Sequence, residues 1–215
     1  KKTAFGVTYM GKIQVLTKEQ QIILAQVKKE PFFEKFYFTG GTALSAFYLQ
    51  HRYSEDLDFF TQEKFDIQDM FNLINSWSKE YGFTFTSEFH QVVYIFMLKF
   101  KNKEVLKVDF GHYDYKRIEK NNIIDGLKTD SLTDIAVNKL LTVTQRSNVK
   151  DFVDLYFLLN KFTVWDLISG VRIKFRMELE SYILASNFLK VEDFDFLPRM
   201  ILPLTLEELK DFFRQ

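Results

Sequence analysis

Residues 37–60 read YFTGGTALSAFYLQHRYSEDLDFF, and this stretch determines the fold class that we expect. Gly40 and Gly41 stand between a short β-prone run, Phe36–Thr39, and a helical pattern over Thr42–His51. The whole chain has only eight glycines, so an adjacent pair indicates a place where the backbone runs close to something else. A strand, a glycine turn and a helix in this order predict a mixed α and β region.

Asp56 and Asp58 lie in or beside a segment, Leu57–Thr61, that otherwise reads as a buried strand. Because side chains alternate faces in a strand, the two carboxylates point the same way, while Leu57 and Phe59 point into the core. Carboxylates this close repel each other, so either one of them is protonated or a cation lies between them. With oxygen ligands and no imidazole or thiolate nearby, the expected cation is Mg²⁺ or Mn²⁺. The alternative is a strand edge whose outer face is simply solvated.

The glycine pair strengthens the metal interpretation. Gly40 and Gly41 let the backbone approach a ligand, and the start of the following helix offers unpaired N–H groups to an anion. Thr39 and Thr42 add hydroxyl donors, although Thr42 could equally be only the N-cap of the helix. A phosphate-binding turn one helix before a metal-binding pair is what group transfer from a nucleoside triphosphate requires.

A third acid is expected on a neighbouring strand. In Val105–Phe110 the alternate apolar residues face one side, whereas Lys107 and Asp109 face the other. Asp109 is the only acid in the middle of this strand, so we expect it beside Asp58; a strand-end cap is the alternative. A second Asp-x-Asp, ending at Asp195, has no glycine pair before it and reads as an acidic loop.

Capping and turn signals divide the chain into two lobes. The fold class that we predict is α+β: a mixed sheet flanked by helices over residues 1–128, with four or five strands, and an all-helical lobe over residues 129–215 that completes the cleft. The remaining expected elements of the first lobe are helices at Thr17–Lys29 and Ile67–Tyr81, and strands at Phe83–Glu88 and Val92–Phe100. In the second lobe, Ser131 caps a helix reaching Arg146, residues 149–160 and most of 164–190 are helical in pattern, and Thr205 caps the last helix.

Composition excludes several classes of protein. A chain of 215 residues with 47% hydrophobic residues has ample material for a packed core. The net charge is zero, so any contact with nucleic acid must be a local patch. No cysteine is present, which excludes disulfides and thiolate chemistry, and the three histidines lack metal-ligand spacing. No apolar run is long enough for a membrane span, so we expect a cytoplasmic protein that does not bind membranes. Met10 is a candidate for the natural start of the chain.

The motifs together resemble those of a known family. The stretch from Gly40-Gly41-Thr42 to Asp58-Phe59 resembles the first motif of nucleotidyltransferases of the DNA polymerase beta type. More narrowly, it is similar to the GG-T-A-L…R-x-S-x-D-hydrophobic-D signature of the AbiEii/AbiGii toxin family. Later motifs of that family, a helical lysine and an Asp-x-x-Asp, are similar to the segments around Lys139 and Asp151–Asp154. The resemblance covers roughly residues 35–160, with one departure: Lys150 stands where relatives often carry an arginine, and Arg146 lies four residues earlier.

The resemblance implies metal-assisted transfer of a nucleoside monophosphate from a nucleoside triphosphate to a hydroxyl. It gives Asp56, Asp58 and Asp109 the roles of ligands to Mg²⁺ or Mn²⁺, with Asp109 also helping to deprotonate the attacking hydroxyl. It implies that the turn Gly40–Thr42 holds the β- and γ-phosphates. Lys139 would then neutralise phosphate charge as a point cation.

Four further residues are candidates for contacts at or near this site. Asp151 and Asp154 share a helical face and either orient Lys139, contact the nucleotide or form an ordinary salt bridge between helices. Arg52 and Arg146 are further candidates for phosphate contacts. The aromatic run from Phe32 to Phe38 is expected to be core and not a platform for stacking bases.

The resemblance also implies a biological setting. Relatives of this kind are toxins of bacterial toxin–antitoxin or phage-defence pairs, with RNA, often the acceptor end of tRNA, as the acceptor and an antitoxin protein as a partner. Two alternatives remain: nucleotidylation of a protein or small-molecule hydroxyl, and a catalytically inactive binding module on the same scaffold. Retention of Asp56, Asp58 and Asp109 argues against the inactive module, because three mutually repelling acids have no use there.

Overall fold

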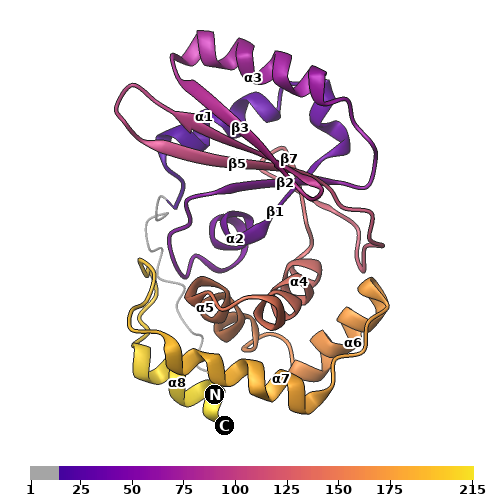
Figure 1. The fold of residues 1–215 in the computed structure, drawn as a ribbon, viewed down its shortest axis with the longest axis vertical. Helices are drawn as coiled ribbons and strands as arrows, with labels where there is room; N and C mark the ends of the chain where they lie inside the picture. The colour runs from indigo at the N-terminus through magenta and orange to yellow at the C-terminus, as the bar shows by residue number, and fades with distance from the viewer. Residues whose placement is uncertain (1–14) are drawn as a thin grey trace, which may run out of the picture.

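The structure is a computed structural model, and it describes residues 15–215 (Figure 1). Met10 and the segment before it lie outside the described residues. The α-helices are α1 (Lys18–Val27), α2 (Gly40–Ala43), α3 (Ile67–Tyr81), α4 (Leu132–Gln145), α5 (Val149–Leu158), α6 (Val164–Phe175), α7 (Ser181–Phe188) and α8 (Leu206–Arg214). A 3₁₀ turn at Pro31–Lys35, a π-helical turn at Leu44–Leu49 and a 3₁₀ turn at Leu189–Asp193 complete the helical segments of this part of the chain.

The strands form one mixed sheet in the order β3-β4-β5-β2-β1-β7-β6. They are β1 (Tyr37–Thr39), β2 (Leu57–Thr61), β3 (Thr84–His90), β4 (Val93–Lys99), β5 (Val105–His112), β6 (Asn122–Ile124) and β7 (Leu127–Thr129). β2 and β5 are parallel, β1 and β7 are parallel, and the other neighbouring pairs are antiparallel. The α+β class is therefore confirmed, and the expectation of four or five strands is too low, since residues 15–215 contain seven.

The two missed strands form a short hairpin, β6–β7. Its turn consists of Asp125 and Gly126, which have φ values of +50° and +74°. Positive φ at both central residues is the geometry of the type I′ hairpin turn, for which Asp-Gly is a favoured sequence. The dipeptide was thus a readable signal, but the three-residue strands on either side were too short to show a period of two.

Several element boundaries follow directly from local chemistry. The Thr17 and Thr205 side chains cap α1 and α8 as predicted, each in a reciprocal capping box. α3 ends at Gly82, which has φ +68° and takes the left-handed conformation that glycine adopts at helix ends. Ser131 caps α4 by accepting a hydrogen bond from the N–H of Asp134.

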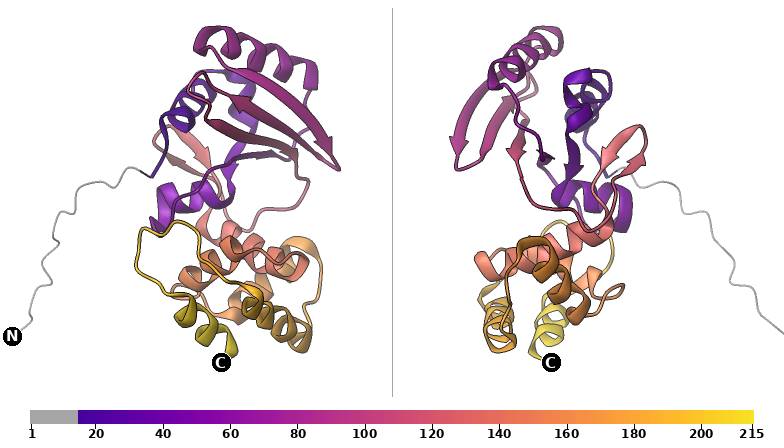
Figure 2. Two further views of the ribbon diagram at one scale, coloured as in Figure 1. Left: turned by 60° about the vertical axis from the view of Figure 1, so that its left-hand side comes forward. Right: turned by 90° about the vertical axis from the view of Figure 1, so that its right-hand side faces the viewer.

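The sheet lies between α3 on one side and the helices α4 to α8 on the other (Figure 1). Figure 1 shows α3 at the top, the sheet beneath it, and α4 to α8 in the lower half, with α2 between the sheet and α4 and α5. Figure 2 shows the same separation from two other directions. The aromatic run from Phe32 to Phe38 is largely core, as predicted: Phe33, Phe36 and Phe38 are buried. Within residues 15–215, no helix has the length and apolar character to cross a membrane.

Candidate active site

The β2–β5 pairing places two acids side by side. Asp58 on β2 is directly opposite Asp109 on the parallel strand β5. Their strand neighbours Leu57, Phe59 and Phe110 are buried, so both carboxylates emerge on the face away from this core. The sequence pattern predicted this juxtaposition. Asp109 lies in the middle of β5, so the alternative of a strand-end cap is wrong.

The environment of this pair disfavours two negative charges. Burial raises the pKa of Asp58 to about 7, and the charge of Asp109 acts in the same direction. Burial also raises the pKa of Asp109, although the Lys107 ammonium partly opposes the shift. One oxygen of Asp109, Oδ1, is buried and has no hydrogen-bond partner among the described residues. A hard cation such as Mg²⁺ would offset the repulsion between the two carboxylates and would give Asp109 Oδ1 a partner.

The glycine turn lies against this pair. β1 ends at Thr39, opposite Asp58 on the antiparallel strand β2, and Gly40 follows with φ +74°. A Cβ atom on Gly40 would lie only 2.0 Å from Asp58 Oδ2, and one on Gly41 would lie 2.7 Å from Nη2 of Arg52. A side chain at either position would have to displace Asp58 or Arg52. The absence of side chains therefore lets the backbone and the Asp58 carboxylate share one small region.

Thr42 and Asp56 are joined to each other. The helix begins at Gly40, two residues earlier than predicted, so Thr39 and not Thr42 occupies the N-cap position. The Thr42 hydroxyl instead donates a hydrogen bond to the backbone carbonyl of Asp56. Asp56 directly precedes β2 and is half-buried. Thr42 thus fixes the chain at the start of the acid-bearing strand.

Lys139 comes from the helical half. It is buried on α4, and its Nζ lies 2.7 Å from Asp151 Oδ1 and 2.7 Å from Asp154 Oδ2, both on α5. Burial alone would lower the pKa of Lys139, but the Asp154 and Asp151 carboxylates outweigh it and raise that pKa. The ammonium is therefore charged and held in place. The structure shows the Asp-x-x-Asp in an ion pair with Lys139 between α5 and α4, and the part of these acids in the reaction stays a prediction.

Asp154 is the centre of a larger buried cluster. Arg52 Nε and Nη2 donate to its two oxygens at 2.6 and 2.8 Å, and His51 Nε2 lies 2.6 Å from Oδ1. Burial opposes ionisation of Asp154, but Lys139 and Arg52 prevail and hold its pKa well below the usual range. The segment just before the acid-bearing strand is thereby fastened to α5. Arg52 is buried in this cluster and does not line the cavity described next.

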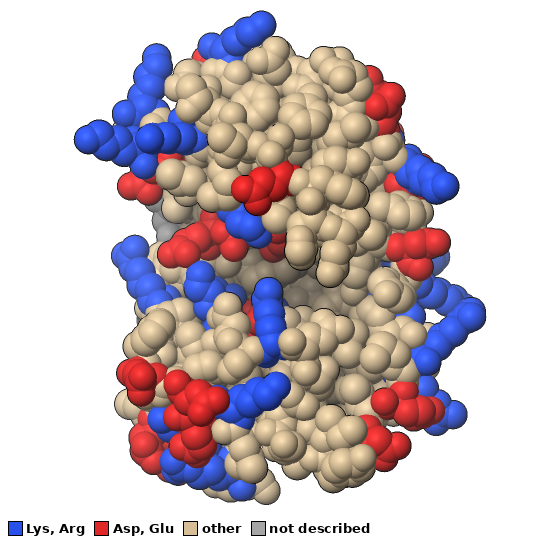
Figure 3. Space-filling model, viewed as in Figure 1, with Lys and Arg blue, Asp and Glu red and all other residues tan. Residues whose placement is uncertain are grey.

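A cavity of about 800 Å³ opens between the sheet and α4. Figure 3 shows a hollow between the upper and lower halves of the molecule, with basic and acidic side chains along its rim. Among the predicted site residues, Gly40, Gly41, Asp58, Asp109 and Lys139 line this cavity. Thr42, Arg52, Asp151 and Asp154 lie behind the lining, as the contacts above describe, and the half-buried Asp56 is also not among the lining residues.

Two further cations belong to this cavity or touch its acids. Lys107 Nζ lies 2.5 Å from Asp109 Oδ2, as an i, i+2 pair on one face of β5. Arg146 lines the cavity, and its Nε lies 2.7 Å from Asp151 Oδ2. Sequence reasoning placed Lys107 and Asp109 on the same face of the strand but assigned no role to the lysine.

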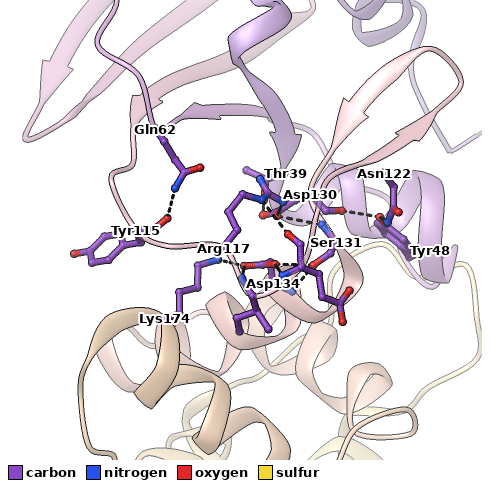
Figure 4. Close-up of polar contacts among 12 residues, drawn as sticks. Thr39, Tyr48, Gln62, Tyr115, Arg117, Asn122, Asp130, Ser131, Asp134 and Lys174 are labelled. Carbon is purple, nitrogen blue, oxygen red and sulfur yellow. Dashed lines mark hydrogen bonds and ion pairs between the residues drawn. The ribbon is translucent and has the colours of Figure 1, made fainter.

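A second polar network fixes the end of β1 where the glycine turn begins (Figure 4). Thr39 Oγ1 donates to Asp130 Oδ2 at 2.8 Å, and the Arg117 guanidinium pairs with Oδ1 of the same acid. Asp134, one turn into α4, pairs with Lys174 at 2.7 Å. Sequence reasoning assigned neither acid a role in the site. The network ties the glycine turn to the start of the helix that carries Lys139.

The residues present fit a divalent cation only together with a substrate. Within residues 15–215, no three His, Asp or Glu side chains are close enough to hold a metal ion between them. Asp58 and Asp109 nevertheless offer two adjacent carboxylates, one with an unsatisfied buried oxygen. Mg²⁺ commonly binds through one or two carboxylates, with waters and substrate phosphates as its other ligands. The pair therefore suits a cation that arrives with a triphosphate.

A carboxylate pair for such a cation, a glycine turn beside it and a fixed ammonium across the cavity are the parts expected for transfer of a nucleotidyl group. The arrangement is therefore the one that we expect of a nucleotidyltransferase. Comparison with family models agrees: residues 22–214 match the family described as nucleotidyl transferase AbiEii toxin, type IV TA system. The chain belongs to this family of nucleotidyltransferase toxins.

One protein of known sequence and two solved structures are similar to this chain. Uncharacterized protein aq_aa25 of Aquifex aeolicus (strain VF5) is 35% identical over 157 residues, which are 71% of this chain and 70% of that protein. The crystal structure of JHP933 from Helicobacter pylori has a similar fold, with a TM-score of 0.59, 22% identity and coverage of 92% of this chain and 90% of its own. MenT4, nucleotidyltransferase toxin Rv2826c from Mycobacterium tuberculosis H37Rv, has a TM-score of 0.50, 15% identity and coverage of 91% and 82%. These two structures show likeness of fold.

Proposed function

We propose that this enzyme transfers a nucleoside monophosphate from an Mg²⁺-bound nucleoside triphosphate to a terminal hydroxyl of RNA, with the 3′ end of tRNA as the expected acceptor. The observation that carries the proposal is the pairing of Asp58 with Asp109 beside Gly40, in a cavity whose other wall holds Lys139. In the host, the protein acts in the cytoplasm as the toxin of a bacterial toxin–antitoxin or phage-defence pair, with an antitoxin as its partner. The family to which the chain belongs supports the toxin role.

The residues divide the work between the two walls of the cavity. Asp58 and Asp109 hold the cation, which supplies neutralisation of triphosphate charge when bound. The backbone of Gly40 and Gly41 holds the β- and γ-phosphates, and Lys139 and Arg146 face them from α4 and its end. The acceptor oxygen attacks the α-phosphorus, its proton passes to Asp109, and the bond to the β-phosphate oxygen breaks as pyrophosphate leaves.

The residues behind the lining act through the lining residues. Thr42 holds the backbone of Asp56. Asp56 is the exception, because its half-buried side chain is proposed as an additional ligand of the cation beside Asp58. Asp151 and Asp154 keep Lys139 charged and aimed, and Arg52 secures Asp154 in turn. We therefore assign Arg52, Asp151 and Asp154 to positioning and not to direct contact with the nucleotide.

A labelling assay tests this function and distinguishes the acceptors. The protein is incubated with Mg²⁺, each α-labelled triphosphate in turn and total RNA, and the label is followed in RNA, protein and small molecules. We expect label in RNA, a loss of at least about a hundredfold in Asp58→Asn, and full activity in Asp195→Asn, which removes an acid from the exposed second Asp-x-Asp. Label on protein or on a small molecule would replace RNA by that acceptor, and no label with any triphosphate would favour the inactive binding module.

A further inference from the structure

The active-site cavity continues into a second cavity at its outer end. The second cavity has a volume of about 480 Å³ and shares Asp114, Tyr115 and Phe175 with the first. It lies between the segment that leaves β5 and the end of α6, and Lys116 and Arg176 contribute to its lining. Molecules that reach the Asp58–Asp109 pair along this route therefore pass from one cavity to the other.

A series of aromatic rings connects the two cavities. Phe60 stacks on Tyr113 with ring centres 5.1 Å apart, Tyr113 contacts Tyr115 at 4.8 Å, and Tyr115 contacts Phe175 at 4.9 Å. All four residues line the first cavity. Tyr115, at the junction, is 43% exposed, and Figure 4 shows it pointing away from the Asp130 network. A flat exposed ring at this point can stack on a planar group.

The outer cavity also carries free positive charge. Lys116 and Arg176 are exposed, and neither forms an ion pair with any residue in 15–215. Lys174, by contrast, is buried and committed to Asp134. Arg176 has φ +56°, a left-handed conformation that glycine adopts more readily, so local backbone preference does not explain an arginine here. Asp114 is the single acid among the residues that line this cavity.

We propose that the groove formed by Tyr115, Phe175, Lys116 and Arg176 binds the single-stranded 3′ end of the RNA acceptor, with a base stacked on Tyr115 and backbone phosphates contacting the two cations. Single-stranded nucleic acid is bound by this combination of stacking rings and a positively charged track. The groove leads the terminal hydroxyl to the Asp58–Asp109 pair. This inference rests on the proposed function, because a small-molecule acceptor would need no groove beyond the first cavity.

Two pairs of variants test the groove. Tyr115→Ala removes the ring, and Tyr115→Phe keeps it. Arg176→Gly removes a charge at a residue with positive φ, and Lys103→Gly does the same in the β4–β5 turn, at φ +70° and far along the chain from the groove. Both glycine variants relieve the same backbone conformation, so they differ only in whether the lost charge belongs to the groove.

The readouts are the KM values for RNA and for the triphosphate, and the affinity for a short 5′-labelled single-stranded RNA as salt is varied. We expect Tyr115→Ala to raise the KM for RNA about fivefold or more with the KM for triphosphate unchanged, and Tyr115→Phe to match the wild type. Arg176→Gly should reduce the slope of log affinity against log salt by about 0.7, and Lys103→Gly should leave it unchanged.

The contrary results separate the two proposals. If the wild type labels RNA and both Tyr115→Ala and Arg176→Gly match it in KM and salt slope, the proposal that the groove binds RNA is wrong, while the proposed function stands. If the wild type labels protein or a small molecule and not RNA, the RNA acceptor and the groove fail together.

Discussion

Gly40 and Gly126 have the same backbone angle in different surroundings. Both have φ +74°, which L-residues with side chains adopt at a cost of about 1–2 kcal/mol. At Gly126 a Cβ atom would meet nothing closer than 3.9 Å, whereas at Gly40 it would meet the Asp58 carboxylate at 2.0 Å. A side chain at Gly126 therefore incurs only the cost of the backbone conformation, whereas one at Gly40 also collides with Asp58.

Replacing each of these glycines by alanine should give different results. Gly126→Ala should lower the free energy of unfolding by about 1 kcal/mol and leave transferase activity intact. Gly40→Ala should also displace Asp58 and reduce activity by at least about a hundredfold. Urea unfolding and the labelling assay measure the two effects. Equal activity in the two variants would show that Gly40 is needed only for the turn.

The raised pKa of Asp58 predicts how stability depends on pH. In the unfolded chain this carboxyl ionises near its ordinary value of 3.8, and in the folded protein at about 7. Between these values the folded protein holds a proton that the unfolded chain has released, so the free energy of unfolding falls as pH rises.

Urea unfolding with EDTA at pH 5 and pH 8 measures this contribution. Between these two pH values, we expect the free energy of unfolding to fall by about 2 kcal/mol more in the wild type than in Asp58→Asn. Asp195→Asn serves as the control and should follow the wild type. Parallel pH profiles for the wild type and Asp58→Asn would show that Asp58 ionises normally.

At the scale of elements, the Asp154 cluster joins the segment before β2 to α4 and α5. Asp154→Ala would leave the buried charge of Arg52 uncompensated and would leave Lys139 with Asp151 as its remaining ion-pair partner. We expect a loss of about 3–5 kcal/mol in the free energy of unfolding. Glu55→Ala breaks the exposed Lys150–Glu55 pair between nearby segments and should cost less than about 1 kcal/mol. Similar losses in both variants, measured by urea unfolding, would contradict the importance of the buried cluster.

Local sequence signals predicted where helices and strands lie better than they predicted contacts between residues far apart in the chain. Caps at Thr17, Ser131 and Thr205 are short-range hydrogen bonds, so the sequence shows them directly. The alternation around Asp58 and Asp109 predicted which face each acid takes, and the strand order then placed them together. The contacts of Arg52 could not be predicted in this way, because its partner Asp154 lies 102 residues away in the sequence, on α5. Its burial depends on tertiary packing alone.

At the scale of the whole molecule, the two halves share many buried contacts. A segment of the helical half pairs with the segment before β2. The Tyr53 N–H donates to the Arg199 carbonyl at 2.9 Å, and the N–H groups of Ile201 and Leu202 donate to the His51 carbonyl at 2.9 and 3.0 Å. A division into lobes of residues 1–128 and 129–215 remains a prediction. The contacts across it lead us to expect the halves to unfold together.

Two probes can follow the halves separately. The chain has two tryptophans, Trp77 in α3 and Trp165 in α6. In Trp165→Phe, fluorescence reports on Trp77 in the sheet half, while circular dichroism at the helix band reports mainly on α4 to α8. We expect the two urea transitions to coincide. Separate midpoints would show two independently stable lobes.

The central claim is that Asp58 and Asp109, facing Lys139, form one site for a metal-bound nucleoside triphosphate. Calorimetric titration with a non-hydrolysable triphosphate, with and without Mg²⁺, tests it most directly. We expect binding by the wild type that requires Mg²⁺, a loss of about tenfold or more in affinity in Asp58→Asn and in Asp109→Asn, and unchanged binding in Asp195→Asn. Mg²⁺-dependent binding of equal strength in all four proteins would contradict the claim, because the nucleotide would then bind elsewhere.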